Sequence, residues 1–153
     1  MPNTYSQIYV HVVFAVKGRR NLVQKSWREE LYKHITGTVQ NKGNKLIAVG
    51  GIEDHVHILI GLNPSQVISD LVRDVKVSST FFINRRGFVI GHFNWQEGFG
   101  AFTISKSEIP RVAGYIANQE RHHKKLSFES EYKEILEENA IEYEEEYLFE
   151  WIR

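Results

Sequence analysis

The chain has 153 residues, of which 42% are hydrophobic and 25% charged, a profile typical of one globular domain with its own core. It contains no cysteine, which excludes a disulfide framework, a thiolate zinc site and a cysteine nucleophile. A secretory signal is not indicated by the start of the chain, MPNTYSQIYVHVVF, and no apolar run is long enough to span a membrane. We therefore expect a cytoplasmic protein.

The formal net charge is zero, but the charges are distributed unevenly. Residues 129–153 contain ten acidic and two basic residues, so residues 1–128 contain 17 basic and 9 acidic ones. A basic body with an acidic C-terminal tail can present a surface that binds phosphates. The alternative is a solvated acidic helix and a scattered basic excess, and charge asymmetry alone does not separate the two.

Hydrophobic periodicity and turn residues predict the order of the elements. Alternation places Val10, Val12 and Phe14 on one face of the first strand. Asn63-Pro64-Ser65 and Ser107 are each expected to cap a helix, and Ser127 to start another. In chain order we predict a strand over 8–17, a helix over 24–41, strands over 45–52 and 55–62, a helix over 65–84, a loop or hairpin over 87–98, a strand over 99–105, helices over 107–125 and 127–139, and an aromatic, acidic end over 143–151 that packs back.

This order predicts the fold class. Strand, helix, strand, strand, helix, strand is the split β-α-β arrangement of a ferredoxin-like α+β sandwich, with an antiparallel sheet and helices on one face. An additional C-terminal helix carries Tyr115. The second face of the sheet is open or is covered by something else.

The first candidate site is the pair His55 and His57, which lie two residues apart in the strand predicted over 55–62. Alternation sends both imidazoles to one face, opposite Val56 and Ile58. Two neutral imidazoles at this spacing can chelate one divalent ion. The alternative is a pair of histidines on a half-exposed face that bind nothing, because short motifs often match by chance.

The second candidate site is on the helix predicted over 107–125. Tyr115 and Gln119 are four residues apart and share a helical face, with His122 on a similar face. A tyrosine near a divalent cation can act as a covalent nucleophile, and a glutamine oxygen suits Mg²⁺ or Mn²⁺. The alternative is a core tyrosine beside a surface glutamine.

Together these two sites suggest phosphodiester chemistry. A metal on His55, His57 and an amide oxygen would polarise a scissile phosphate, and Tyr115 could attack it. The phosphotyrosine product would conserve the energy of the broken bond, so the strand could be rejoined without ATP.

The ordered set of motifs resembles the single-tyrosine HUH transposases, which include insertion-sequence transposases and their domesticated relatives at repeated palindromes. The resemblance covers nearly the whole chain and is specific as a set, although no single motif is. The motifs that carry it are residues 10–20 (VHVVFAVKGRR), 51–59 (GIEDHVHIL), 95–102 (WQEGFGAF) and 115–119 (YIANQ).

The resemblance implies a role for each candidate residue. His55 and His57 would be metal ligands, Gln119 the third ligand and Tyr115 the nucleophile. The family implies Mg²⁺ or Mn²⁺, cleavage of single-stranded DNA near a hairpin, a 5′-phosphotyrosine intermediate and a free 3′-hydroxyl. It also implies a homodimer in which the tyrosine helix of one subunit can serve the histidines of the other.

Basic and aromatic residues offer a surface for the DNA strand. Phosphate contacts would make binding strongly dependent on salt. Phe81, Phe82, Phe93 and Trp95 can stack on unpaired bases or pack in the core, and His11 is near the site or simply exposed. The candidate DNA-binding residues are Lys17, Arg19, Arg20, Arg73, Lys76, Arg85 and Arg86.

Three other functions are compatible with parts of the sequence. A histidine-triad nucleotide hydrolase also has alternating histidines, but Leu59 occupies the place of its third histidine. A non-catalytic, domesticated DNA or RNA hairpin-binding module would keep the fold without the chemistry. A ferredoxin-like RNA-binding domain leaves the paired histidines unexplained.

Overall fold

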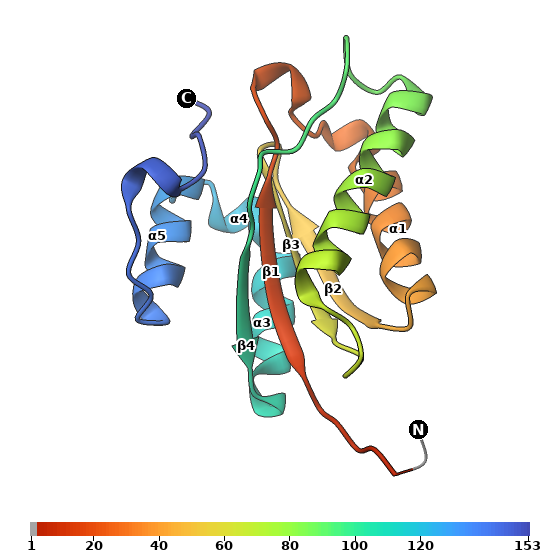
Figure 1. The fold of residues 1–153 in the computed structure, drawn as a ribbon. Helices are drawn as coiled ribbons and strands as arrows, with labels where there is room; N and C mark the ends of the chain where they lie inside the picture. The colour runs from red at the N-terminus through yellow and green to blue at the C-terminus, as the bar shows by residue number, and fades with distance from the viewer. Residues whose placement is uncertain (1–2) are drawn as a thin grey trace.

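The computed structural model describes residues 3–153 and contains a four-stranded antiparallel sheet with helices on both sides (Figure 1). The strands are β1 (Tyr9–Ala15), β2 (Lys45–Gly51), β3 (His55–Gly61) and β4 (Gly100–Ile104). They are ordered β2-β3-β1-β4, and every neighbouring pair is antiparallel. This order confirms the predicted ferredoxin-like α+β fold.

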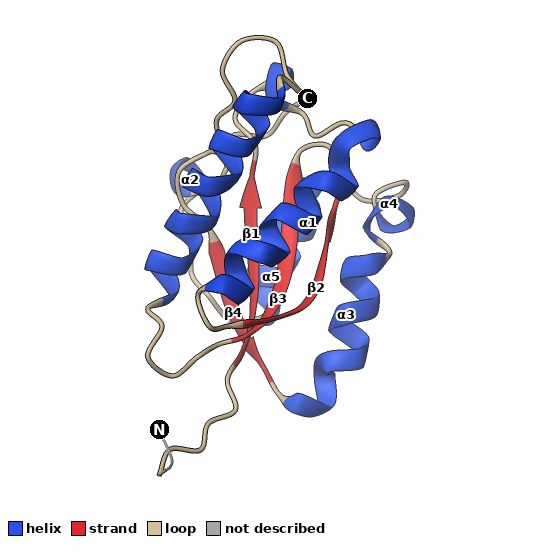
Figure 2. Cartoon of the chain, turned by 90° about the vertical axis from the view of Figure 1, so that its right-hand side faces the viewer, coloured by secondary structure: helices blue, strands red, loops and turns tan. Residues whose placement is uncertain are grey.

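The first face of the sheet carries the main hydrophobic core. Helices α1 (Lys25–Asn41) and α2 (Ile68–Arg86) lie side by side across it (Figure 2). Because strand side chains alternate, β1 and β3 each send every second residue into this layer. Each fully buried aliphatic side chain there contributes roughly 1.5–3 kcal/mol of transfer free energy. The buried residues from these two strands are Val10, Val12, Phe14, Val56, Ile58 and Ile60.

The second face, for which the sequence leaves the covering element open, is covered by the C-terminal third of the chain. Two smaller clusters hold the covering helices, one beneath α3 (Ile109–Ala117) around Leu59 and one beneath α5 (Phe128–Glu138) around Phe102. The end of the chain packs back onto the second cluster through Phe149 and Trp151. The remaining elements are η1 (Arg19–Asn21), η2 (Lys106–Glu108), α4 (Gln119–His122) and η3 (Glu145–Tyr147).

The single helix predicted over 107–125 is wrong. The structure interrupts it at Asn118, whose backbone (φ −102°, ψ 24°) leaves the helical region between α3 and α4. Asparagine competes for backbone hydrogen bonds and tolerates such conformations. The predicted cap at Ser107 is also wrong, because Ser107 caps no helix. Ser127, predicted only to start a helix, caps α5 through a bond from the Ser130 amide (3.1 Å).

The helix predicted over 65–84 begins later, at Ile68. The reason is local: the side chain of Asn63 accepts from the Ser65 amide (2.9 Å) and its carbonyl accepts from the Gln66 amide (2.9 Å). These bonds form a turn that uses the amides a helix would need.

Among residues 3–153, no helix combines the length and the apolar character needed to cross a membrane.

Candidate active site

The two histidines of β3 point, as predicted, away from the main core and into the layer between the sheet and α3–α5. Both His55 and His57 are completely buried. β1 adds a third imidazole, because its register with β3 places His11 on the same face. The Nε2 atom of His11 lies 2.8 Å from Nδ1 of His57. His11 is therefore part of this cluster rather than exposed.

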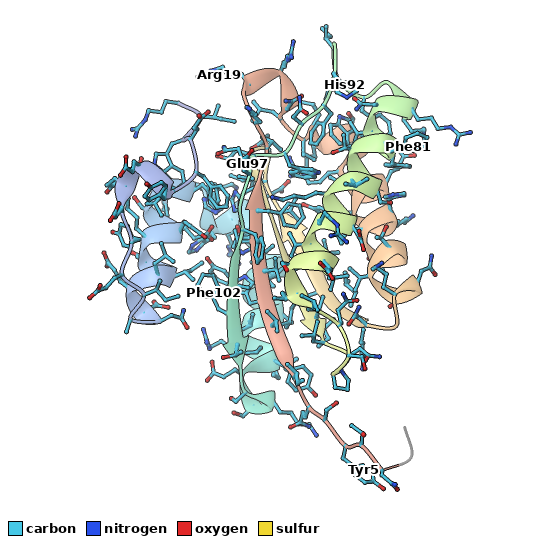
Figure 3. All side chains as sticks on the ribbon, viewed as in Figure 1. Tyr5, Arg19, Phe81, His92, Glu97 and Phe102 are labelled. Atoms are coloured by element: carbon cyan, nitrogen blue, oxygen red, sulfur yellow. The ribbon has the colours of Figure 1, made fainter. Side chains whose placement is uncertain are left out.

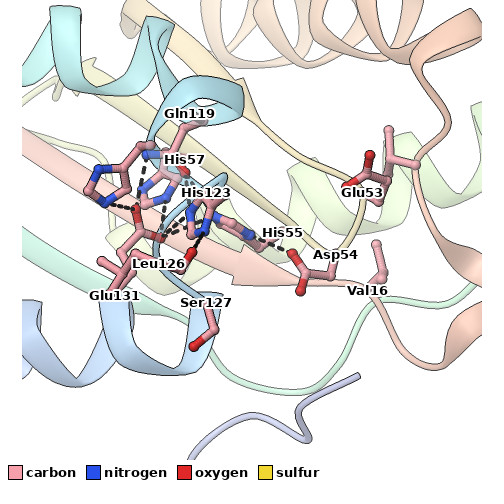
Figure 4. Close-up of polar contacts among 12 residues, drawn as sticks. Val16, Glu53, Asp54, His55, His57, Gln119, His123, Leu126, Ser127 and Glu131 are labelled. Atoms are coloured by element: carbon pink, nitrogen blue, oxygen red, sulfur yellow. Dashed lines mark hydrogen bonds and ion pairs between the residues drawn. The ribbon is translucent and has the colours of Figure 1, made fainter. Parts of the chain in front are cut away.

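A buried glutamate occupies the centre of the cluster (Figure 4). Glu131, on α5, is only 1% exposed. Its Oε1 atom lies 3.1 Å from the Nε2 atoms of three imidazoles, those of His55, His57 and His123. An ionised carboxylate buried this deeply requires such partners, since desolvation would otherwise strongly disfavour the charge.

Tyr115 and Gln119 reach the same glutamate from α3 and α4. The hydroxyl of Tyr115 donates a hydrogen bond to Oε2 of Glu131, and Nε2 of Gln119 donates to the same oxygen (3.0 Å). The other end of Gln119, Oε1, lies 2.9 Å from Nε2 of His55 and of His123. One chain therefore brings the predicted nucleophile and all the predicted ligands together.

Sequence reasoning missed Glu131 and His123. Glu131 belongs to the acidic tail by composition, yet it lies three residues after Phe128 and one before Tyr132, on the apolar face of α5. A lone carboxylate on an apolar helical face is the signal that could have indicated it. For His123 the only signal was its position one turn beyond Gln119.

The electrostatics of the cluster follow from burial and from Glu131. Burial lowers the pKa of His57 to about 4 despite its contact with the glutamate. Burial also opposes ionisation of His55, but bonds to Asp54 and Glu131 outweigh it and raise the pKa of His55 to about 9. Burial and the adjacent Glu131 carboxylate raise the pKa of Tyr115, so the phenol keeps its proton in this arrangement.

Three of these side chains form a group that can hold a metal ion. One ligand atom each from His55, His57 and Glu131 lies within 4.8 Å of the others, and all three residues are buried. Two imidazoles and a carboxylate form a mixed nitrogen and oxygen donor set that suits Mn²⁺ and related divalent ions. The residues present therefore fit a divalent metal.

Comparison with known sequences identifies the family. Residues 4–119, which span the two histidines and Tyr115, match the sequence family described as Transposase IS200 like. The chain belongs to this transposase family. Membership of this family implies that the protein is a DNA-cleaving enzyme. Glu131 and His123 lie beyond the matched stretch.

Individual relatives of the transposase support the same family assignment. The ISDra2 transposase TnpA of Deinococcus radiodurans is 25% identical over 122 residues, which cover 74% of this chain and 84% of that protein. Two solved structures share the fold. A transposase from Deinococcus radiodurans R1 has a TM-score of 0.60 at 23% identity and covers 76% of this chain and 94% of its own. A REP-associated tyrosine transposase bound to a REP hairpin has a TM-score of 0.61 at 16% identity, covering 81% and 73%.

A groove of about 510 Å³ leads from the surface of the transposase to Tyr115. It runs between α3 and α5 and over β4. Its walls carry the carboxylates of Glu108, Glu134 and Glu138, with Glu131 at the inner end, against the single guanidinium of Arg111. This approach to the tyrosine is acidic, in contrast to the basic surface that DNA phosphates favour.

The predicted DNA-binding residues are not all brought together: Arg73, Lys76 and Arg85 line one cavity along α2, and the others do not line it. Lys17, Arg19 and Arg20 are exposed just beyond β1, and Arg19 is at the top of the molecule in Figure 3. Arg85 and Arg86 lie at the end of α2, on the opposite side of the sheet from Tyr115, and Arg86 pairs with a glutamate of α1.

Two further predicted DNA-binding residues, Arg73 and Lys76, already bond to other groups of the protein. Arg73 lies 3.3 Å from both Asp70 and Asp74. The ammonium of Lys76 donates to the carbonyls of Gln96 (2.8 Å) and Gly98 (2.6 Å), and burial lowers its pKa to about 8.

The aromatic residues proposed to stack on bases are mostly structural. Phe93 is completely buried, and Trp95 is buried with its indole N–H donating to Ser79 (2.9 Å). Phe82 stacks on the ring of His34. Phe81 is the exception, because 67% of it is exposed. It lies on the outer side of α2 (Figure 3).

Proposed function

We propose that this transposase cleaves and rejoins single-stranded DNA at hairpin-containing ends, with Tyr115 as the nucleophile. One observation carries the proposal: the Tyr115 hydroxyl bonds to the same buried carboxylate that contacts His55 and His57. A nucleophile thus adjoins a group that can hold a metal. The hairpin substrate is supported by the relative of similar fold that was solved with a REP hairpin.

We infer that His55, His57, Gln119 and Glu131 would hold the divalent ion, either Mg²⁺ or Mn²⁺. Gln119 belongs to this set because its Oε1 atom faces His55 at 2.9 Å. Glu131 adds the negative charge that hard divalent cations prefer. When bound, the ion supplies positive charge that polarises the scissile phosphate and favours the phenolate of the neighbouring tyrosine.

The chemical step follows from the position of Tyr115. Its oxygen attacks the phosphorus, the new O–P bond forms, and the bond from phosphorus to the 3′-oxygen breaks. The product is a 5′-phosphotyrosine and a free 3′-hydroxyl, which takes up a proton. The phenolic proton passes to solvent through the groove that reaches Tyr115, since imidazole contacts hold the pKa of the Glu131 carboxyl far below its usual range. Attack by a 3′-hydroxyl on the phosphotyrosine reverses these changes and rejoins the strand.

The tyrosine and the histidines that it serves belong to the same chain in this proposal. Val112 and Ile116 of α3 pack against Leu59 on the sheet and hold Tyr115 beside His57. Exchange of tyrosine helices within a homodimer would require α3 to leave this contact. Mixing Tyr115→Phe with His57→Ala tests the point: own-chain action predicts no adduct from the mixture, whereas exchange would restore it.

The decisive experiment is incubation of the protein with labelled single-stranded hairpins and Mn²⁺, followed by a denaturing gel. Wild type should give a labelled protein band, and removal of the metal should abolish it. Tyr115→Phe should lose the band and still bind the hairpin, because only the nucleophilic oxygen is removed. A band from Tyr115→Phe would exclude Tyr115 as the nucleophile. Binding without a wild-type band would indicate a non-catalytic hairpin-binding module.

A further inference from the structure

A second cavity lies beside the candidate active site, between α1 and the junction of α3 and α4. It measures about 660 Å³. Helix α4 separates it from the histidines: Gln119 faces His55, whereas Glu120 and Arg121 line the cavity. A strand that crosses α4 could therefore contact both places.

Two residues that line the cavity each carry a buried donor with no hydrogen-bond partner among residues 3–153. Arg28 and Tyr32, one turn apart on α1, both line it and are 5% and 8% exposed. The Nε atom of Arg28 and the hydroxyl of Tyr32 are the unpaired groups. Buried donors are nearly always satisfied in native proteins because an unpaired one costs about 1–3 kcal/mol. Two of them in one cavity indicate a ligand that accepts hydrogen bonds.

Four basic side chains line the cavity against two acidic ones, a balance that favours an anionic ligand: Lys25, Arg28, Arg121 and Lys124 against Glu29 and Glu120. The other nitrogens of Arg28 bond to the carbonyl of Val23 (3.0 Å) and to Glu120 (3.0 Å), and its Nη2 atom also lies 3.5 Å from Glu53. Glu120 also pairs with Lys25 (3.4 Å). The side chain of Glu120 is 51% exposed, so it can move aside for another anion. Arg121 and Lys124 line the cavity and form no ion pair with any part of the chain from residue 3 onward.

We propose that this cavity binds a backbone phosphate of the DNA strand that crosses α4 toward Tyr115. The identification of the ligand as DNA rests on the proposed function. Arg28 Nε and the Tyr32 hydroxyl donate to the phosphate oxygens, while Arg121 and Lys124 attract the adjoining linkages. The cavity thereby positions the strand on one side of α4 and the reacting phosphate on the other.

The first test uses Tyr32→Phe, which removes one hydroxyl and leaves the shape of the side chain. Hairpin binding is measured by fluorescence anisotropy without added metal, and folding by thermal denaturation. We expect roughly fivefold weaker binding with an unchanged or raised Tm, because an unpaired buried hydroxyl is removed. Tyr147→Phe, at a tyrosine that is 79% exposed on η3, is the matched control. Unchanged binding by Tyr32→Phe would overturn the proposal.

The second test locates the phosphate. A single neutral methylphosphonate linkage is moved along the hairpin strand, and binding is measured for wild type and for Lys124→Gln and Tyr32→Phe. We expect the neutral linkage to weaken hairpin binding by wild type at one position. At that position it should weaken binding by both variants much less. Lys33→Gln, on α1 outside the cavity, should behave as wild type. Equal penalties in wild type and variants would contradict the assignment.

The same samples are assayed for the covalent adduct, which separates the two proposals. An adduct from wild type together with unchanged binding by the variants would reject the phosphate site alone. Loss of binding by the variants, with no adduct from wild type, would reject the proposed strand transfer and leave the phosphate site standing.

Discussion

At the scale of single residues, Glu131 determines how the cluster is charged. Burial alone would raise its pKa, but hydrogen bonds with His123, His55 and His57 hold the pKa of this carboxyl far below its usual range. The glutamate in turn favours the protonated form of the neighbouring phenol. A cation bound to the same carboxylate would offset this negative charge. The protonation state of the Tyr115 phenol therefore depends on whether Glu131 contacts a cation.

Glu131→Gln keeps the size of the side chain and removes its charge. If Glu131 is a ligand, Mn²⁺ affinity should fall by about 10- to 100-fold in titration calorimetry, and His57→Ala should cause a loss at least as large. Glu134→Gln, which lines the groove without contacting these imidazoles, should bind Mn²⁺ as wild type does. A rise in affinity in Glu131→Gln would show that the carboxylate competes with the ion instead of binding it.

Gly50 permits the close approach of α3 to the sheet. A Cβ atom at this position would lie 2.3 Å from the carbonyl oxygen of Ile116. Gly50→Ala should therefore destabilise the protein by about 1–3 kcal/mol in urea denaturation, because backbone would have to shift. Gly37→Ala, in open space on α1, should stabilise it by about 0.5–1 kcal/mol. Equal effects of the two substitutions would contradict this account.

At the scale of elements, the site depends on three short helices and not on one long one. The interruption at Asn118 separates the helix of Tyr115 from that of Gln119. Helix α5 then places Glu131 between them, held by Phe128, Tyr132 and Leu136 on the sheet. Burial raises the pKa of Tyr132 to about 12, in keeping with its place in this cluster.

The cap of α5 tests this dependence. Ser127→Ala should cost about 1 kcal/mol of stability, because the Ser130 amide loses its acceptor. It should also weaken Mn²⁺ binding, since frayed residues at the start of α5 lie close to Glu131. Ser107→Ala serves as the control, because Ser107 caps no helix. A loss of stability in Ser107→Ala as large as in Ser127→Ala would contradict the assignment of the cap.

At the scale of the whole molecule, the charges are sorted onto different surfaces. The groove that reaches Tyr115 is acidic, whereas Arg19 and Arg20 are exposed beyond the end of β1 at which His55 lies. A DNA strand would gain electrostatic attraction from this end of the sheet and lose it in the groove. We expect the salt dependence of binding to come from basic residues that form no ion pair within residues 3–153, such as Arg19 and Arg20 beyond β1 and Arg121 and Lys124 beside the second cavity, and not from those already paired.

Replacing Arg19 and Arg20 together with glutamine tests this expectation. The slope of log affinity against log salt should fall by about one for each phosphate that the variant no longer neutralises. Arg73→Gln should change the slope little, because Arg73 already pairs with Asp70 and Asp74. Hairpin binding measured at several salt concentrations distinguishes the two, and an equal fall for Arg73→Gln would refute the assignment.

Much of the fold could be predicted from the sequence because its patterns are local. Alternation within one strand puts His55 and His57 on the same face, and the order of strands and helices indicates the ferredoxin-like sheet. Tyr115 and Gln119 also stay close to each other despite the interruption at Asn118, because the Gln119 side chain lies 3.5 Å from the Tyr115 carbonyl. Each of these properties depends on residues a few positions apart.

The sequence by itself therefore determined which side chains share a strand or a helical turn. Only the tertiary structure decided which faces meet. Glu131 is 74 positions from His57, yet they are in contact, and His11 reaches His57 across 46 positions. The basic residues of α2 are separated from Tyr115 because the sheet lies between them. Such pairings arise from packing whole elements against one another, a constraint that no periodicity within a single element records.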